Sequence, residues 1–422
     1  MLGADGLTDT SLTEAPAGCG PILPPAGRIQ RPLRQQVFEH VRAQGRAARA
    51  DIARALCISA GSVTALTADL IAMGLLREVE GAPLEGREAG RGRPPVALEI
   101  VPDGRHVIGI KLSDERQSAV LADFGGRRLA DAVLPAPARR KALTEALDEV
   151  EALVSRLREQ APGRRVDAVG IGLSGLVDHR TGRVAWSPLL EGEDIAFKQA
   201  AEERLGLPVH VDNDANVLTL AELWFGAGRA LPDFAVVTIE HGVGMGLVLD
   251  GRLFRGSRGM GLELGHIKVQ LDGALCRCGQ RGCLEAYLAD YALAREAATA
   301  LDRDPRAPQS PQAMLETLFR EAKAGHHAAR TIFARAGRYL AVGLANVVQL
   351  FDPDLIILSG ERMRYDFLYA DEVLAEMQDL TLTKGRPPAR VEIHAWGDLV
   401  WAQGAVALAL GMLTDEVLGS GS

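Results

Sequence analysis

The spacing of apolar residues divides the chain into a short helical part and a longer part in which strands and helices alternate. Residues 31–45 repeat apolar side chains at helical intervals up to a glycine, and two shorter helices are predicted over 49–59 and 59–74. Ser59 is a favourable N-cap for the last helix. Two short helices joined by a tight turn, the second starting with small polar residues, predict a helix-turn-helix.

The segments on either side of this motif complete the N-terminal part. Residues 75–81 and 94–101 flank a glycine-rich connection and are predicted to be the two strands of a wing. Residues 31–100 are therefore expected to form a winged helix-turn-helix domain. Residues 1–30 are rich in Gly, Pro, Ala and Thr without apolar periodicity, which predicts a flexible tail.

From residue 105 onward the pattern is that of an α/β protein. Strands are predicted at 106–112, 118–124 and 127–134, followed by a helix and by the apolar strand 166–175. Further strands and helices alternate as far as the closing helix 401–413. A chain of 422 residues exceeds one ordinary core, so two or three compact units are expected.

Charge adds an asymmetry to this picture. The chain has 47% hydrophobic and 24% charged residues, ordinary values that argue against wholesale disorder. Of the net charge of −8, residues 31–95 contribute +3, from ten arginines and seven acidic residues, which leaves −11 for the rest. A basic part on an acidic protein favours nucleic-acid binding by the basic part alone. No membrane span or secretory signal is recognisable, so a cytoplasmic protein without membrane partners is expected.

Three of the five cysteines lie within eight positions, close to a histidine. His266, Cys276, Cys278 and Cys283 have the spacing H-x9-C-x-C-x4-C, which offers three thiolates and one imidazole to a tetrahedral zinc ion. Because no position is left open, such a site is structural and would fix a loop that lacks apolar residues. The alternative is three reduced cysteines in a loop. Glycines beside Cys278 and Cys283 favour the metal, because a tight turn needs permissive backbone.

Three segments resemble the signature sequences of one protein family. They read VDNDANVLTLAELWFGAG, GMGLVLDGRLFRGSRGMGLELGHIKV and CRCGQRGCLEAY. The pattern is similar to that of the ROK family, the bacterial sugar kinases and sugar-responsive repressors with an actin-like, ribonuclease-H-like fold. With the helix-turn-helix, the whole arrangement resembles the repressor branch, which includes the xylose and N-acetylglucosamine repressors. The resemblance implies a two-lobed ROK domain over 101–422, with a zinc-stabilised loop at 263–285.

The resemblance also implies which residues bind the sugar. In the family an Asn-Asp pair binds sugar hydroxyls, and its Asp is the base in kinases; here the pair is Asn213 and Asp214. The Glu and His of the E-x-G-H segment correspond to Glu263 and His266, and the Glu after the last cysteine to Glu285. Carboxylates and an amide suit a polyol, because they exchange hydrogen bonds with neighbouring hydroxyls. On the residues alone, Asn213 and Asp214 are also explained as a helix cap.

The segments that hold nucleotide in the family's kinases are altered. The first strand of those kinases ends in D-x-G-G-T, whereas this chain has Asp114 nearby and no glycine pair. Glu240 and His241 occupy the second phosphate loop, and Ser359 and Glu361 replace glycines in a third segment. Since phosphoryl transfer needs a backbone cradle for phosphates, a sugar sensor without catalysis is expected. The alternatives are an active sugar kinase that also binds DNA, and a zinc-stabilised DNA-binding scaffold with a vestigial sugar pocket.

DNA contacts are predicted at two places in the winged domain. Ser59, Ser62 and Thr64 are small, which lets the recognition helix approach the major groove and leaves phosphates to hydroxyls and amides. Arg91 and Arg93 in GRGRPP resemble a minor-groove hook, with an ordinary basic loop as the alternative. The expected partners are double-stranded operator DNA of two-fold symmetry, a small-molecule sugar effector and further copies of the chain, as a homodimer or homotetramer.

Overall fold

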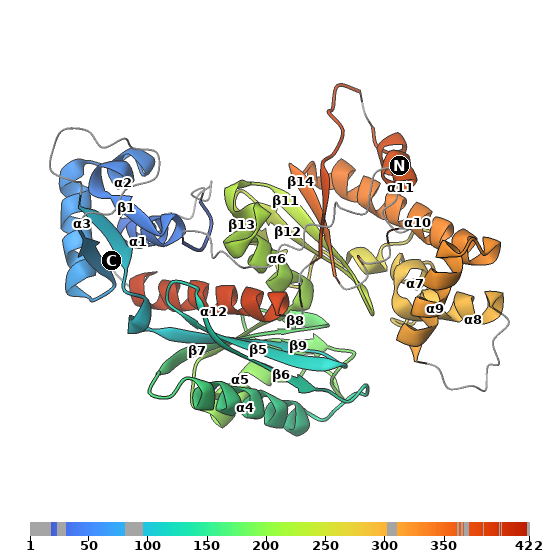
Figure 1. Ribbon diagram of the computed structural model, residues 1–422, viewed down its shortest axis with the longest axis horizontal. Coiled ribbons are helices and arrows are strands. Elements are labelled where there is room, and N and C mark those ends of the chain that lie inside the picture. Colours follow the sequence, from blue (N-terminus) through green and yellow to red (C-terminus); the bar gives the residue numbers. More distant parts are fainter. Residues whose placement is uncertain are drawn as a thin grey trace. The chain divides into compact units, whose positions relative to one another are not determined.

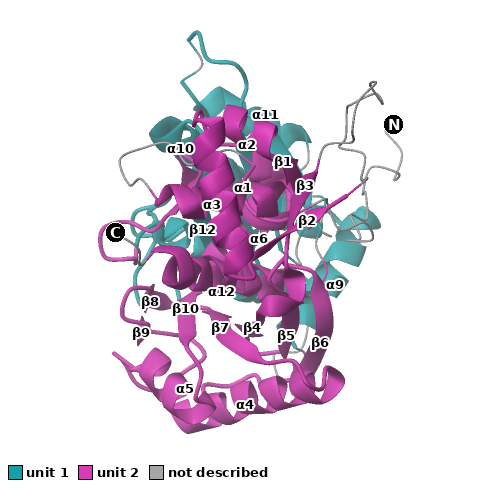
Figure 2. Ribbon diagram, turned by 90° about the vertical axis from the view of Figure 1, so that its left-hand side faces the viewer, with its two compact units in different colours: residues 1–11, 233–247, 261–396 teal, residues 12–232, 248–260, 397–422 magenta. Residues whose placement is uncertain are grey.

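The computed structural model describes residues 18–22, 31–80, 96–301, 310–360, 363, 366, 371–382, 384–395, 397 and 399–419. The chain forms two compact units (Figure 2). Unit 1 holds Asp233–Leu247 and Gly261–Trp396, and unit 2 holds Leu12–Pro232, Val248–Met260 and Gly397–Ser422.

The N-terminal part of unit 2 is the predicted winged helix-turn-helix. Its elements are α1 (Leu33–Gln44), β1 (Arg46–Ala48), α2 (Arg49–Ala55), α3 (Ala60–Ala72), β2 (Leu76–Val79) and β3 (Ala97–Ile100). The strands form an antiparallel sheet of order β1-β3-β2. Gly45 ends α1 with a φ of 71°, and the Ser59 side chain accepts a hydrogen bond from the Ser62 amide, so both predicted boundaries are confirmed.

The remainder of unit 2 is built on a five-stranded sheet of order β10-β7-β4-β5-β6 (Figure 2). Its strands are β4 (His106–Leu112), β5 (Arg116–Asp123), β6 (Arg128–Pro135), β7 (Val166–Leu173) and β10 (Val209–Asn213). Strands β4, β5 and β6 are antiparallel, whereas β7 and β10 run parallel to β4. Helices α4 (Leu143–Gln160) and α5 (Phe197–Leu205) cover one face, and α12 (Val400–Gly419) covers the other (Figure 1).

Helix α12 packs closely on the sheet and on α6 (Asp214–Phe225) because glycines remove side chains from the contacts. A Cβ atom added at Gly109 would lie 2.0 Å from the Ala402 carbonyl oxygen, and one at Gly404 would lie 1.7 Å from the Val217 carbonyl oxygen. Only glycine permits such an approach of one backbone to another. We call this sheet with α4, α5, α6 and α12 the sheet lobe.

A second five-stranded sheet, with most of its strands in unit 1, has the order β13-β12-β11-β14-β15. Its strands are β11 (Phe234–Ile239), β12 (Val243–Leu249), β13 (Arg252–Phe254), β14 (Leu355–Ser359) and β15 (Val391–His394). Strands β11, β14 and β15 are parallel. The helices of unit 1 are α7 (Glu285–Leu288), α8 (Asp290–Ala300), α9 (Pro311–Lys323), α10 (His327–Phe351) and α11 (Asp371–Leu380).

Several short elements were too short for periodicity to reveal them. They are β1, the hairpin of β8 (Leu176–Asp178) and β9 (Arg183–Trp186), and the 3-10 turns η1 (Pro102–Gly104), η2 (Ala227–Ala230) and η3 (Leu264–His266). Within the described part of the chain no single helix is long and apolar enough to cross a membrane; only α2 and α3 together reach that length and composition, with a bend of 116° between them.

The expectation of a flexible tail over residues 1–30 is wrong for residues 18–22. Cys19 is 3% exposed, its amide donates to the Arg42 carbonyl at 3.0 Å, and the Gly20 amide donates to the Trp224 carbonyl at 2.9 Å. Composition could not predict this burial, because the partners come from α1 and α6. The other residues of 1–30 lie outside the described part of the chain.

Candidate metal centre and ligand site

The cysteine segment forms a loop that two backbone bridges shape. Lys268 pairs with Cys283, and Leu275 pairs with Arg281. Gly282 has a φ of 76°, and a Cβ atom there would lie 1.8 Å from the Gln270 carbonyl oxygen. The glycine next to Cys283 is therefore required by a left-handed backbone and by a close approach, as the sequence predicted.

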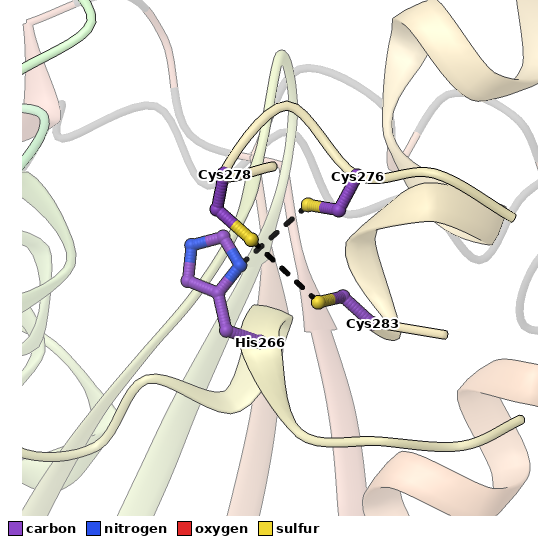
Figure 3. A group of neighbouring side chains, drawn as sticks. All are labelled: His266, Cys276, Cys278 and Cys283. Carbon is purple, nitrogen blue, oxygen red and sulfur yellow. Dashed lines mark hydrogen bonds between the residues drawn. The ribbon is translucent and has the colours of Figure 1, made fainter. Parts of the chain in front are cut away.

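The four predicted metal ligands point toward one another (Figure 3). One ligand atom from each of His266, Cys276, Cys278 and Cys283 lies within 4.8 Å of the other three. The Sγ atoms of Cys278 and Cys283 are 3.7 Å apart, and Cys276 Sγ is 3.7 Å from His266 Nδ1. Ligands held at about 2.3 Å from a tetrahedral zinc ion lie about 3.8 Å from one another. The cluster can therefore hold a metal such as zinc.

The surroundings of the cluster suit thiolate ligands. Lys268 Nζ donates to Cys283 Sγ at 3.0 Å, and this hydrogen bond raises the pKa of Lys268. Burial raises the pKa of the Cys276 thiol, so its deprotonation depends on a nearby positive charge, which a bound metal would supply. His266 faces the thiols through Nδ1. A metal there would fix the ring and leave Nε2 for a second partner.

Asn213 and Asp214 lie at the carboxyl ends of two parallel strands of the sheet lobe. Leu173, the last residue of β7, pairs with Asn213 at the end of β10. The Asn213 side-chain oxygen accepts from the amides of Ala215 at 2.8 Å and Asn216 at 3.4 Å, and its nitrogen donates to the Gly175 carbonyl at 3.0 Å. Asn213 is thus the N-cap of α6, as the alternative interpretation predicted. The carboxyl ends of parallel strands are also where α/β proteins bind ligands.

Asp214 is the first residue of α6 and is half-buried. One of its carboxylate oxygens accepts a hydrogen bond from the hydroxyl of Ser174, which follows β7. A negative charge is favourable at a helix N-terminus, so Asp214 is suited to accept hydrogen bonds from a ligand hydroxyl. Sequence reasoning missed Ser174, because nothing in its own segment shows that β7 lies beside β10.

A buried ion pair between Asp212 and Arg255 lies next to Asn213 and the start of α6. Asp212 is fully buried, and Arg255 donates to its Oδ2 from Nε at 2.7 Å and from Nη2 at 2.6 Å. The other oxygen of Asp212 accepts from the Asn216 side chain at 2.8 Å and from the Asn213 amide at 2.8 Å. Two guanidinium donors on one oxygen and two further donors on the other fix the carboxylate and, through it, the start of α6. The pairing spans 43 residues of sequence, which explains why local patterns did not reveal it.

The other predicted sugar-binding residues belong to unit 1. Glu263 precedes η3, and its carbonyl accepts from the His266 amide at 2.9 Å. Glu285 begins α7 and is 9% exposed; its carboxylate accepts from the Val243 amide at 3.4 Å and from the Tyr291 hydroxyl at 3.4 Å. Burial raises the pKa of Tyr291, which keeps that hydroxyl a donor. Glu263 and His266 are therefore joined by the 3-10 turn η3. The Glu285 carboxylate contacts the loop of the three cysteines, where its Oε1 lies 3.5 Å from Cys276 Sγ.

The turns between β4 and β5 and between β11 and β12 are held by contacts within the protein. Between β4 and β5 the Ser113 hydroxyl donates to the Arg116 carbonyl at 2.7 Å, and the Ser113 amide donates to Gln117 at 3.0 Å. Between β11 and β12, His241 Nδ1 lies 3.0 Å from a carboxylate oxygen of Asp290, a residue that is almost fully buried. The Asp290 carboxylate thus lies against the turn between β11 and β12.

The predicted DNA-binding residues of α3 are exposed. The hydroxyls of Ser59 and Ser62 lie 2.8 Å apart, and the Thr64 hydroxyl donates to the Ala60 carbonyl at 2.9 Å. Ser59 therefore caps the helix while its hydroxyl stays at the surface. Arg91 and Arg93 lie outside the described residues, so the predicted hook stays a prediction.

Comparison with known proteins agrees with this architecture. A profile of the ROK family matches residues 107–412. The DNA-binding transcriptional dual regulator NagC of Escherichia coli (strain K12) is 29% identical over 329 residues, 77% of this chain and 79% of that protein. A solved ROK family transcriptional regulator, a homologue of the E. coli MLC protein, has a TM-score of 0.75 and 26% identity, covering 91% of this chain and 96% of that one.

Kinases of the same family are similar over a smaller share of the chain. The structure of a ROK family glucokinase from Streptomyces griseus, in complex with glucose and AMPPNP, has a TM-score of 0.62 and 30% identity. It covers 72% of this chain and 99% of that chain. Since the family profile matches well over half of the sequence, this protein belongs to the ROK family.

Proposed function

We propose that this protein is a sugar-responsive transcriptional regulator, a repressor that binds operator DNA and is released by a monosaccharide or a derivative. One observation carries the proposal: unit 2 joins a winged helix-turn-helix to a ROK sheet lobe. The similarity to a ROK transcriptional regulator extends over 91% of the chain, against 72% for the glucokinase, which supports the regulatory role over the enzymatic one.

Five residues are proposed to bind the sugar, and each is considered within its own unit. In unit 2, Asp214 and Asn213 offer a carboxylate and an amide at the carboxyl end of the sheet. In unit 1, Glu263 and the Nε2 of His266 offer further hydrogen-bonding groups, and the carboxylate of Glu285 offers another. Zinc bound by His266, Cys276, Cys278 and Cys283 would supply no chemistry to the sugar and would hold the His266 ring in place.

The altered nucleotide segments support binding without catalysis. Glu240 and the His241–Asp290 pair occupy the turn where kinases of the family bind phosphate, and carboxylates there oppose a triphosphate. An active sugar kinase is the second candidate, favoured by Asp214, the residue that corresponds to the base in the kinases, and by the 30% identity with the glucokinase. A coupled assay with ATP and each sugar separates the two: sustained turnover supports the kinase.

We propose that the chain binds DNA as a homodimer or homotetramer, in which two winged domains are related by two-fold symmetry. The exposed α3 would enter the major groove with Ser59, Ser62 and Thr64 near the phosphates, while Arg91 and Arg93 enter the minor groove. A homodimer presents two such domains, so the operator is expected to have two-fold symmetry.

The experiment that tests the proposed function measures sugar binding and operator binding in the same protein. We expect a thermal-shift screen of pentoses, hexoses, amino sugars and their phosphates to yield a ligand that weakens operator binding in a gel shift. Asp214→Asn should lower the affinity for that ligand about tenfold or more, because a hydrogen bond to a charged group is lost.

The matched control is Asp148→Asn, which removes an exposed carboxylate on α4 that pairs with Arg204. This variant should bind sugar as the wild type does. Equal sugar binding by Asp214→Asn and the wild type would remove Asp214 from the site. A screen in which no sugar changes operator binding would reject the regulatory role.

A further inference from the structure

The carboxyl-terminal half of α1 is buried against the sheet lobe within unit 2. Arg42, on α1, is 2% exposed. Its guanidinium lies 4.5 Å from the ring centre of Trp224 on α6, and its Nη1 donates to the Thr414 hydroxyl on α12 at 2.8 Å. Burial lowers the pKa of Arg42. A cation held between a ring and a hydroxyl is a specific contact that a merely apolar helix face does not need.

Other contacts join the same two parts. The rings of Phe38 on α1 and Phe124 after β5 lie 5.1 Å apart, and the Gln35 side chain donates to Asp415 on α12 at 2.6 Å. The contact of α1 with the sheet lobe thus extends along the helix from Gln35 through Phe38 to Arg42.

Residues 18–22 fill the edge of this contact. We call them the strap. Arg229 donates to the Gly20 carbonyl from Nε at 3.0 Å and to the Ala43 carbonyl from Nη2 at 2.5 Å, so one side chain holds both the strap and the last turn of α1. A Cβ atom at Gly126 would lie 2.7 Å from Cys19 Sγ, which shows how closely the strap fits the lobe.

Helix α6 connects this contact to the proposed sugar site. Asn213 and Asp214 stand at its N-terminus, and Trp224 stands in its last turn. Every residue from Ala215 to Trp224 is buried, and Gly404 of α12 lies against the Val217 backbone. A buried helix clamped along its length transmits a displacement of one end to the other, because interiors have low compressibility.

We propose that Arg42 couples the winged domain to the sheet lobe, so that the two act as one cooperative body and a sugar held at the start of α6 acts on the DNA-binding part through Trp224 and Arg42. The second half of this inference rests on the proposed function. The first half concerns the protein without ligand and is tested separately.

The first test is amide hydrogen exchange of the full chain without ligand, comparing the wild type with Arg42→Met, which keeps the apolar stem and removes the cation. Wild-type α1 should be protected as well as α6, and Arg42→Met should speed exchange in α1 about tenfold while α6 keeps its protection. The control is Arg204→Met, which removes an exposed arginine that pairs with Asp148 and Glu151 and should change neither helix.

Wild-type α1 that exchanges freely, or unchanged protection in Arg42→Met, would overturn the coupling. Should Arg42→Met fail to fold, Thr414→Val removes only the hydroxyl that Arg42 binds, and a selective loss of protection in α1 is expected there too. An α1 unaffected by Thr414→Val in that case also overturns the coupling.

The second test measures operator affinity with and without the sugar found in the screen. Arg42→Met should bind the sugar as the wild type does, while the effect of sugar on operator affinity falls about tenfold. A full sugar effect in Arg42→Met contradicts the coupling. If wild-type operator binding responds to no sugar, the proposed function fails, and the exchange experiment still decides whether Arg42 joins the two parts.

Discussion

At the scale of the residue, Asn213 has one role in the structure and a second role under the proposed function. Its amide caps α6 and contacts the Gly175 carbonyl, and the resemblance also assigns it to the sugar. The two roles are compatible, because a cap fixes the side chain in place and a fixed group loses less entropy when it meets a ligand. The cap was therefore no argument against a ligand site.

The burial of the His210 side chain predicts that the stability of the sheet lobe depends on pH. It lies in β10, three residues before Asn213, and burial lowers its pKa to about 4. The unfolded chain binds a proton near the ordinary histidine pKa of 6.5, so the unfolded state binds more protons between pH 4 and pH 6.5. The stabilisation is complete above pH 6.5 and is lost as the pH falls toward 4. Between pH 7 and pH 4.5 we expect His210 to account for a loss of about 2 kcal/mol.

Urea unfolding of His210→Phe at both pH values checks this expectation. The difference in unfolding free energy between them should be smaller than in the wild type, whatever the absolute stability of the variant. His327→Phe replaces an exposed histidine at the start of α10 and should leave the difference unchanged. Identical pH dependence in His210→Phe and the wild type would count against a neutral buried imidazole.

At the scale of the element, the loop that contains Cys276, Cys278 and Cys283 has few apolar contacts to hold its conformation. Cys276, Cys283 and Ala286 form a small buried cluster, with Ala274 and Tyr287 packed against it. Leu271 and Leu275 in the same loop are exposed, at 78% and 54%. So small a cluster stabilises a loop weakly, and a structural metal commonly supplies what is missing.

Loss of the metal should therefore be visible in the protein itself. We expect one zinc ion per chain in native mass spectrometry of the wild type, and none in Cys278→Ser. The unfolding midpoint of Cys278→Ser should fall by about 5 °C or more, since a bound structural metal adds to the folding free energy. Cys57→Ser, at the exposed cysteine between α2 and α3, should keep both the zinc and the midpoint. Zinc retained in Cys278→Ser would show that the cluster is not the site.

Local elements followed from the sequence, whereas contacts between elements did not. The Ser59 cap, the Gly45 stop and the spacing of the metal ligands are decided within a few residues, and the structure agrees with them. Ser174 contacts Asp214, and Arg255 contacts Asp212, only because β7, β10 and β13 come together in the fold. Periodicity describes one element at a time, so it contains no information about such partners.

At the scale of the whole molecule, charges of opposite sign are carried by different parts of the chain. Residues 31–95 carry +3 and the rest of the chain −11, so under the proposed function we expect operator DNA to be attracted to the winged domain and repelled by the remainder. We expect this opposition to orient the protein on DNA before any specific contact forms. We also expect binding to be sensitive to salt, because each arginine near a phosphate releases a counterion.

Arg91 and Arg93, which lie outside the described residues, are the predicted DNA hook. Replacing Arg91 and Arg93 with Ala should weaken operator binding about tenfold or more, which corresponds to about 1.4 kcal/mol, and should reduce the dependence of affinity on salt. Arg204→Ala removes an exposed arginine from the sheet lobe and should leave the titration unchanged. The residues at the start of α3 that are predicted to approach the major groove have small side chains. An unchanged titration of the double variant at moderate salt would therefore mean that the operator is held without the hook, by hydroxyls and amides of α3 alone.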